Sequence, residues 1–134
     1  MSQQNVDLVR SAYDAYNRRD VEGVLGAFDP MIDWNVPDSL AWGGHAAGID
    51  AVARFFQGLR PYLGDRHEVA VDELIDAGDR VVALVRHRGV APDGEGYDVP
   101  SIMIWTAAGG KLVAMYEQLD SLALARATEA ATAV

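Results

Sequence analysis

Few residues of this chain have side chains suited to proton transfer. The sequence has three histidines and no cysteine, which excludes a cysteine nucleophile, disulfide bonds and cysteine-based metal sites. An acid, Asp120, stands where the strand-like run "KLVAMYEQL" meets the helix-forming run "SLALARA". One histidine, His87, lies inside the apolar run "VVALVRHRGV", and another, His45, lies in the glycine-rich stretch "WGGHAAG". A carboxyl group and an imidazole in an apolar pocket could exchange protons with a bound compound near neutral pH.

Asp120 allows two interpretations. An aspartate directly before a helix accepts hydrogen bonds from the first backbone N–H groups and so caps the helix. Ser121, the next residue, could cap the helix instead, and Asp120 would then be free to transfer protons.

The orientation of His87 depends on which face of its strand is buried. In a strand of period two, His87 shares a face with Val85, and Arg86 and Arg88 share the other face. We expect the face with His87 to point inward, either as a structural histidine or as a second proton-transfer group. The opposite orientation stays open, because Val82 and Leu84 make the arginine face apolar as well.

The other two histidines occupy different settings. His45 lies near Trp42 in a loop, and loops at the rim of a scaffold often carry function. The alternative is a surface histidine without a role. His67 stands between Arg66 and Glu68, and we expect it to be solvated.

The elements that must position these residues fall into two halves. Residues 6–20, 21–28 and 49–59 have apolar residues at helical spacing, with Asp20 as the cap of the second helix. Residues 31–37 read as a short strand. The strand-like runs at residues 67–76, 80–90, 97–106 and 111–120 are separated by turn compositions, which predicts an antiparallel meander. Pro100 inside the third run indicates a bulge or an edge position.

This order predicts an α+β fold in which a cone-shaped, curved antiparallel sheet is packed with three N-terminal helices. The inside of such a cone is an apolar pocket, the usual place for a small ligand. A flat wall for a hydrophobic or aromatic ligand could come from large side chains of several elements. The expected ligand-binding residues are Tyr13, Tyr16, Trp34, Trp42, Phe56, Met103, Trp105 and Gln118.

The chain has 134 residues, which fits a single domain over residues 1–134, and we expect the last eight or so residues to fray. A net charge of −9 argues against nucleic acid and anionic membranes as partners. No signal-like segment or membrane span is evident, and a cytoplasmic protein is expected. Metal-binding motifs and phosphate-binding loops are lacking, so we expect no metal and no cofactor. Apolar residues on the outer sheet face, in "VAVDEL" and "IMIW", predict a homodimer.

Five segments, "AYDAYNRRDVEGVLGAF", "DWNVP", "GIDAVARFF", "GDRVVALVR" and "GGKLVAMYEQLD", follow one another in an order and spacing that resemble the SnoaL-like polyketide cyclase family. This family belongs to the nuclear transport factor 2-like superfamily. The resemblance runs from about Val6 to Leu124 and implies the cone fold. It also implies acid/base chemistry without a cofactor, an aldol-type cyclisation or isomerisation of a polyketide-like ring compound. The acid that closes the last strand would be the general acid/base, and Asp120 has that position.

The resemblance keeps other functions of the superfamily open. Steroid isomerases of the superfamily have their base at the position of Val36, so their chemistry is not expected. Epoxide hydrolases use an Asp-Arg-Asp set, to which Arg86 or Arg88 could contribute. Dehydratases use paired histidines with a tyrosine and an aspartate, and His45, His87 and the tyrosines of the first helix could supply such a set. A protein that only binds a small molecule is the alternative from a different functional class.

Overall fold

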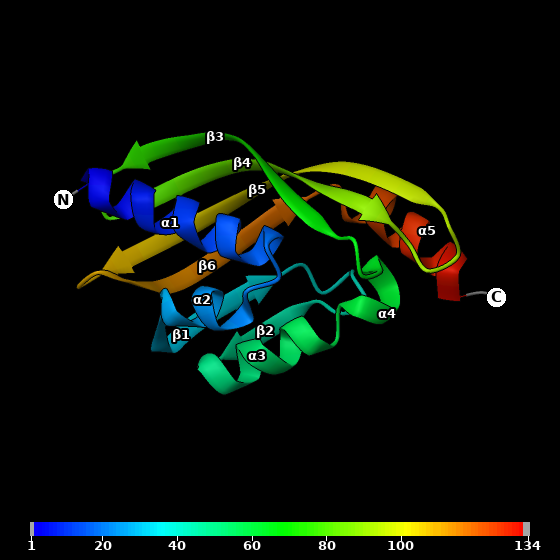
Figure 1. Cartoon of the computed structure of the whole chain (residues 1–134), viewed down its shortest axis with the longest axis horizontal. Helices are drawn as coiled ribbons and strands as arrows, with labels where there is room; N and C mark the ends of the chain where they lie inside the picture. The colour runs from blue at the N-terminus through cyan, green and yellow to red at the C-terminus, as the bar shows by residue number, and fades with distance from the viewer. Residues whose placement is uncertain (1, 133–134) are drawn as a thin grey trace.

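The computed structural model describes residues 2–132 and contains five helices and six strands in that range (Figure 1). The helices are α1 (Ser2–Asn17), α2 (Val21–Gly26), α3 (Ile49–Gln57), α4 (Arg60–Leu63) and α5 (Ser121–Thr132). The strands are β1 (Phe28–Val36), β2 (Gly44–Ala47), β3 (Glu68–Ala77), β4 (Arg80–Val90), β5 (Gly96–Ala108) and β6 (Lys111–Leu119).

The strands form one sheet in the order β2-β1-β6-β5-β4-β3. Strands β3 to β6 make the predicted antiparallel meander. Strand β1 joins this meander at the edge of β6 and runs parallel to it, and β2 pairs antiparallel with β1. The predicted α+β architecture is therefore confirmed, with one parallel strand pair added.

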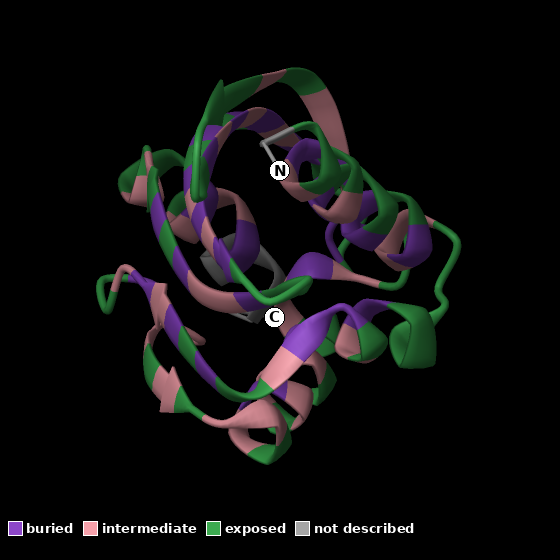
Figure 2. Ribbon diagram, turned by 90° about the vertical axis from the view of Figure 1, so that its left-hand side faces the viewer, coloured by how far each residue is buried: buried purple, intermediate pink, exposed green. Residues whose placement is uncertain are grey.

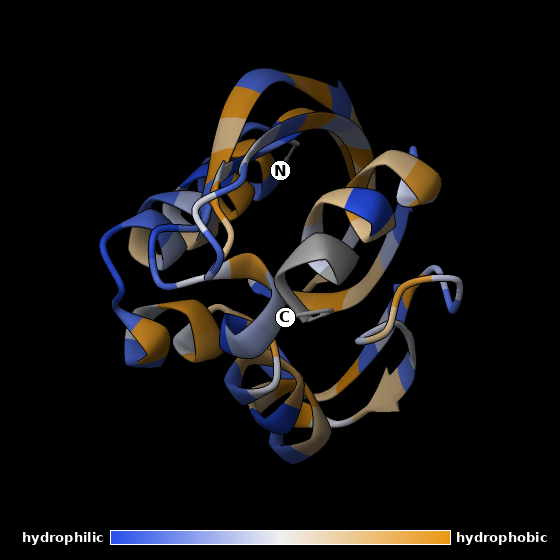
Figure 3. Cartoon of the chain, turned by 90° about the vertical axis from the view of Figure 1, so that its right-hand side faces the viewer, coloured by the Kyte–Doolittle hydropathy of each residue, from blue (hydrophilic) through white to orange (hydrophobic). Residues whose placement is uncertain are grey.

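The sheet curves round an interior that the helices close on the other side (Figure 2). Helix α1 packs on β3, and α3 packs on β1. Helix α5 lies across one end of the molecule, as Figure 3 shows, and buries Leu124 there. Because the sheet wraps round a single interior, alternate residues of β1, β4, β5 and β6 point into one core.

The burial pattern of β4 settles the orientation of its histidine. Val81, Ala83, Val85 and His87 are buried, and Arg86 lies on the other face, where its guanidinium pairs with Asp98 at 2.6 Å. His87 therefore points inward, as expected. Since Arg86 and Arg88 face away from the interior, the Asp-Arg-Asp arrangement has no inward arginine on this strand.

Two prolines occupy positions where a missing backbone N–H is tolerated. At Pro100, β5 has a neighbour on one side only, because β6 pairs with β5 from Ser101 onward. This agrees with the predicted edge position. Pro61 lies in the first turn of α4, where its missing N–H removes no hydrogen bond. The N-terminal part thus contains four helices rather than the predicted three.

The glycine-rich stretch was predicted as a loop, but part of it is the strand β2. His45 in this strand pairs with Asn35 of β1. A sequence of small residues has little strand propensity, and pairing with the free edge of β1 decides its conformation. Gly43 permits the preceding turn, because a Cβ there would lie 1.8 Å from the carbonyl oxygen of Pro37.

The end of the chain continues as helix further than predicted. Helix α5 extends to Thr132, so it includes most of the segment expected to fray. The last two positions, 133 and 134, lie outside the described residues.

Candidate functional site

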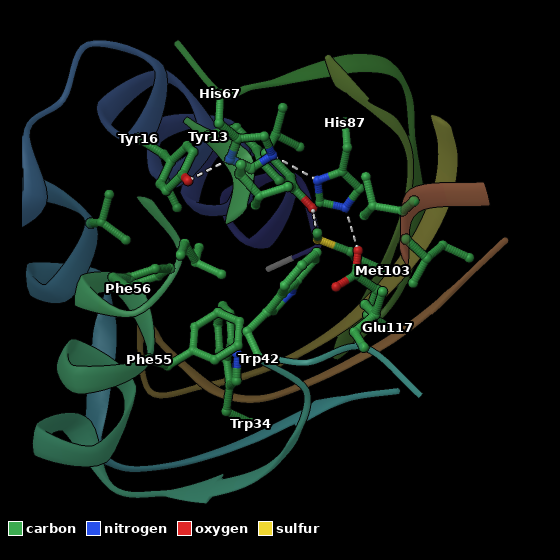
Figure 4. A pocket seen from close by; sticks show the side chains of 18 of the residues that line it. Tyr13, Tyr16, Trp34, Trp42, Phe55, Phe56, His67, His87, Met103 and Glu117 are labelled. Atoms are coloured by element: carbon green, nitrogen blue, oxygen red, sulfur yellow. Dashed lines mark hydrogen bonds and ion pairs between the residues drawn. The ribbon is translucent and has the colours of Figure 1, made fainter. Parts of the chain in front are cut away.

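The interior of the cone holds a cavity of about 60 Å³ that is mostly apolar (Figure 4). Seven of the eight expected ligand-binding residues line it: Tyr13, Tyr16, Trp34, Trp42, Phe56, Met103 and Trp105. Three polar side chains, His67, His87 and Glu117, also line it. The cavity is smaller than the roughly 150 Å³ of an engineered cavity that binds benzene. A ring-sized ligand therefore requires an outward movement of side chains at its boundary.

A chain of hydrogen bonds crosses one side of this cavity (Figure 4). The Tyr16 hydroxyl lies 2.6 Å from His67 Nδ1, and His67 Nε2 lies 2.9 Å from His87 Nδ1. His87 Nε2 lies 2.5 Å from Glu117 Oε2, which also accepts a hydrogen bond from Ser101 Oγ at 2.7 Å. His67, His87, Ser101 and Glu117 are all buried. This chain of hydrogen bonds therefore joins one carboxyl group, two imidazoles and one phenol, and bulk water is excluded from it.

Donor and acceptor requirements allow two proton arrangements in this chain. With a neutral His87 that donates from Nε2 to ionised Glu117, its Nδ1 accepts from His67, and His67 in turn accepts from Tyr16. With a protonated His87, both of its nitrogens donate, and the two remaining hydrogen bonds reverse direction. Each of the three hydrogen bonds has a donor and an acceptor in both arrangements.

The environment keeps two members of the chain neutral. Burial, followed by the nearby His87 and Arg19, lowers the pKa of His67 well below its usual 6.5. Burial raises the pKa of Tyr16 to about 12. At neutral pH the Tyr16 phenol thus keeps its proton, and His67 is an uncharged imidazole that can both donate and accept.

The strand register explains why these residues meet. His87 and Glu117 lie on β4 and β6, which flank β5. Glu117 pairs with Met103 of β5, and Ser101 lies two residues before Met103 on the same face. His67 directly precedes β3, whose first inward residue, Val69, pairs with His87. Three neighbouring strands and the start of a fourth therefore bring the polar side chains together.

Helix α1 places Tyr16 against His67 through its C-terminal end. The Asn17 side chain donates to the Val69 carbonyl oxygen and accepts from the Val69 N–H, both at 2.9 Å. Arg19 Nη1 donates to the His67 carbonyl oxygen at 2.5 Å. These contacts hold the end of α1 to the start of β3, so the Tyr16–His67 hydrogen bond has a fixed geometry.

Two tryptophans of the cavity wall differ in their hydrogen bonding. The Trp105 indole N–H donates to the Tyr13 hydroxyl at 2.9 Å, and this hydroxyl donates to Met103 Sδ at 3.0 Å. The Trp34 indole nitrogen is buried and has no hydrogen-bond partner among the described residues. A buried donor without an acceptor costs about 1–3 kcal/mol.

Asp120 lies outside the cavity. It is exposed, and its carboxylate accepts a hydrogen bond from the Ala123 N–H at 3.0 Å, the contact of a helix cap. Ser121, the alternative cap, instead bonds Ser39 through its hydroxyl at 2.8 Å. The geometry favours capping over proton transfer for Asp120.

His45 and Gln118 also lie away from the cavity. His45 is exposed on β2, and its side chain forms a hydrogen bond with the Asp33 carboxylate. This contact lowers the pKa of the Asp33 carboxyl. Gln118 is exposed on β6 and donates to the Tyr116 hydroxyl at 2.6 Å. Strand alternation puts Gln118 on the outer face, because its neighbour Glu117 points inward.

Sequence reasoning missed three polar residues of the site: His67, Ser101 and Glu117. His67 was expected to be solvated, but it is 5% exposed, because the end of α1 covers it. Ser101 and Glu117 carried a usable signal: each lies two residues from a buried methionine, Met103 or Met115, in the same strand phase. Within residues 2–132, no cluster of three or more His, Asp or Glu side chains is arranged to hold a metal ion.

Comparison with models of protein families identifies the family of the chain. The profile of the SnoaL-like domain matches residues 9–115, which is most of the sequence. The chain therefore belongs to the SnoaL-like family, and its fold is the nuclear transport factor 2-like, or cystatin-like, fold.

Solved structures agree with this assignment over nearly the whole chain. A nuclear transport factor 2-like protein from Burkholderia pseudomallei K96243 is 30% identical, with coverage of 93% of this chain and 97% of that chain and a TM-score of 0.84. TerC, co-crystallized with polyporic acid, is 26% identical, with coverage of 94% and 98% and a TM-score of 0.88. A candidate SnoaL-like polyketide cyclase from Jannaschia sp. CCS1 is 25% identical, with coverage of 96% and 94% and a TM-score of 0.82.

Comparison with curated proteins finds no match. In the described part of the chain, no helix has the length and apolar character needed to cross a membrane.

Proposed function

We propose that the chain is a cofactor-independent enzyme that moves protons on an apolar, oxygenated ring substrate, in an aldol-type cyclisation or an isomerisation. The observation that carries this proposal is the buried His87–Glu117 pair, which lines an otherwise apolar cavity. Family membership and the candidate polyketide cyclase among similar structures support the reaction class. The co-crystallization of TerC with polyporic acid supports a small aromatic ligand for this chain as well.

In this mechanism Glu117 is the base. Its Oε2 atom accepts from His87 and Ser101, and Oε1 takes part in neither contact. The carboxylate removes a proton from the carbon next to a substrate carbonyl. The electrons of the broken C–H bond form a carbon–carbon double bond, and the carbonyl oxygen becomes an enolate. In a cyclisation the enolate carbon then attacks a second carbonyl carbon of the same molecule, the π electrons of that C=O bond move to its oxygen, and this oxygen takes the proton from Glu117. In an isomerisation Glu117 instead returns the proton to another carbon. Burial of the pair excludes water from the intermediate.

Dehydration of a hydroxy ketone is a second candidate, favoured by the His67–His87 contact and its hydrogen bond to Tyr16. Paired histidines with a tyrosine and an acid are the set that dehydratases of the superfamily use. Here Glu117 would remove the proton, and the leaving hydroxyl would take a proton from the histidine–tyrosine chain and depart as water. The set differs from the one predicted, since His67 and Glu117 replace His45 and an aspartate.

Proton exchange tests the proposal without knowledge of the natural substrate. In D₂O, the chain is expected to speed exchange of the protons next to the carbonyl of 2-tetralone, an aromatic ring ketone, as followed by ¹H NMR. Glu117→Gln should reduce the rate by about 10²-fold or more, the scale of a lost general acid/base. Glu73→Gln, a matched change at an exposed site on β3, should leave the rate unchanged.

The same experiment separates catalysis from binding alone. If 2-tetralone binds but exchanges no faster than in buffer, the chain is a small-molecule-binding protein with respect to ring ketones, and the proposal fails. A Glu117→Gln variant with the wild-type rate would also overturn it.

We further propose that the chain forms a homodimer through the outer face of the sheet. Ile102 on β5 and Tyr116 on β6 are 45% and 49% exposed on these adjacent strands. Large exposed side chains that lie together on a sheet face are typical of an interface.

A further inference from the structure

The indole N–H of Trp34 is a hydrogen-bond donor without an acceptor. Trp34 is only 5% exposed, and its nitrogen is the one buried side-chain N or O atom in the described part of the chain that lacks a hydrogen-bond partner. Trp105, in the wall of the same cavity, has its N–H satisfied by Tyr13. In native proteins nearly all buried polar groups form hydrogen bonds. An unpaired donor in a cavity wall is therefore a candidate contact for a ligand.

Aromatic rings surround the Trp34 indole, and no acceptor among the described residues lies within hydrogen-bond distance of its nitrogen. Four aromatic rings, those of Phe28, Phe55, Phe56 and Trp105, lie with their centroids 5.5–5.7 Å from the Trp34 ring. A ring face is only a weak acceptor for an N–H group. The indole therefore lies in an apolar environment in which an oxygen atom of a ligand would be its strongest partner.

The strand register puts Trp34 near Glu117 along the sheet. Trp34 on β1 pairs with Met115 on β6, and Glu117 follows two residues later on the same face. From the spacing of paired strands and the rise of two residues, the Cα atoms of Trp34 and Glu117 are roughly 8 Å apart. The two histidines lie on the opposite side of the cavity from Trp34 (Figure 4). One small ring compound can therefore span both groups.

We propose that Trp34 Nε1–H donates a hydrogen bond to an oxygen acceptor of the bound ring compound, and that it selects ligands carrying a ketone or enolate oxygen. The proposal rests on the proposed function for the choice of a ring ketone, but it concerns binding alone and needs no turnover. A ligand without an acceptor leaves the donor unpaired in the complex, and such a mismatch weakens binding.

The test compares two ligands of nearly equal shape. Tetralin is the hydrocarbon that corresponds to 2-tetralone and has no oxygen. Their dissociation constants are measured by NMR titration with the wild-type chain and with Trp34→Phe, which removes the N–H and keeps an aromatic ring. The variant should bind 2-tetralone about tenfold more weakly relative to tetralin, the size of one hydrogen bond. Trp42→Phe, a matched change elsewhere in the cavity wall, should alter both affinities by the same factor.

The indole N–H resonance gives a second measurement that needs no cavity variant. The chain has three tryptophans, and the resonance assigned to Trp34 should move downfield with 2-tetralone but not with tetralin. An equal shift with both ligands, an unchanged affinity ratio in Trp34→Phe, or no binding of 2-tetralone overturns the proposal.

Glu117→Gln keeps this test independent of the proposed function. That variant should lose proton exchange and still prefer 2-tetralone to tetralin by the wild-type factor. Loss of the preference only in Trp34→Phe supports the acceptor site even if no exchange is ever observed.

Discussion

At the scale of single residues, the site consists of groups whose protonation depends on their neighbours. His67 is the clearest case, because helix α1 and Tyr16 cover it and the backbone of residue 67 is tied to Arg19. An imidazole in this position loses its hydration and gains no carboxylate contact in return. Its neutral form is thereby favoured in the folded protein.

This burial predicts a pH dependence of stability. The pKa of His67 lies well below 6.5 in the folded state, so between that pKa and about 6.5 the unfolded chain binds a proton that the folded chain does not. The free energy of unfolding should therefore decrease as the pH falls below about 6.5. Urea unfolding at pH 7.5 and 5.5 measures the decrease. His67→Gln removes this titration, so its stability should fall less between the two pH values, and an equal fall in both proteins would contradict the assignment.

At the scale of elements, α5 closes one end of the cavity. Leu124 of this helix is 1% exposed and lines the cavity, and the first turn of the helix is capped by Asp120. Asp120 therefore stabilises the helix that closes the cavity, although its own side chain does not line the cavity. A polar residue at the end of a pocket strand can thus have a structural role.

Substitutions at Asp120 distinguish the two roles. Asp120→Ala should lower the free energy of unfolding by about 1 kcal/mol, since it removes the side-chain acceptor, and Asp120→Asn should change it by only a few tenths, because asparagine caps about as well. Urea unfolding measures both values. Proton exchange of 2-tetralone should stay at the wild-type rate in Asp120→Asn. A hundredfold slower exchange with unchanged stability would instead assign the proton-transfer role to Asp120.

At the scale of the whole molecule, the helices cover one face of the sheet and leave parts of the other exposed. Sedimentation at micromolar concentration should give twice the 14.5 kDa of the single chain. Ile102→Asp, which puts a charge on the proposed interface, should shift the protein to the monomer. Ile75→Asp, on the edge strand β3 and exposed to 40%, is the matched control and should remain dimeric. A wild-type monomer would contradict the proposed dimer.

The sequence by itself determined the fold class and most of the elements. The four strand-like runs and the helical spacing in residues 6–20 follow from local patterns of apolar side chains. The same patterns favoured an inward His87 but left the opposite orientation open. The same patterns predicted most of the residues of the cavity wall, because large apolar side chains at inward positions are buried in the interior of the sheet. Strand phase also held the signal for Glu117, which shares its face with Met115.

Only the tertiary structure decided which polar residues meet. The two charged neighbours of His67 predict a surface residue. His67 is nevertheless buried, because the end of α1 packs over the start of β3. Strand β2 forms because β1 offers a free edge, and Trp34 is left without an acceptor because the side chains round it are aromatic. Contacts between residues far apart in the chain depend on register and packing. A local pattern carries no information on them. Asp120 was predicted as the acid of the site from the family resemblance, whereas Glu117 is the acid that lines the cavity.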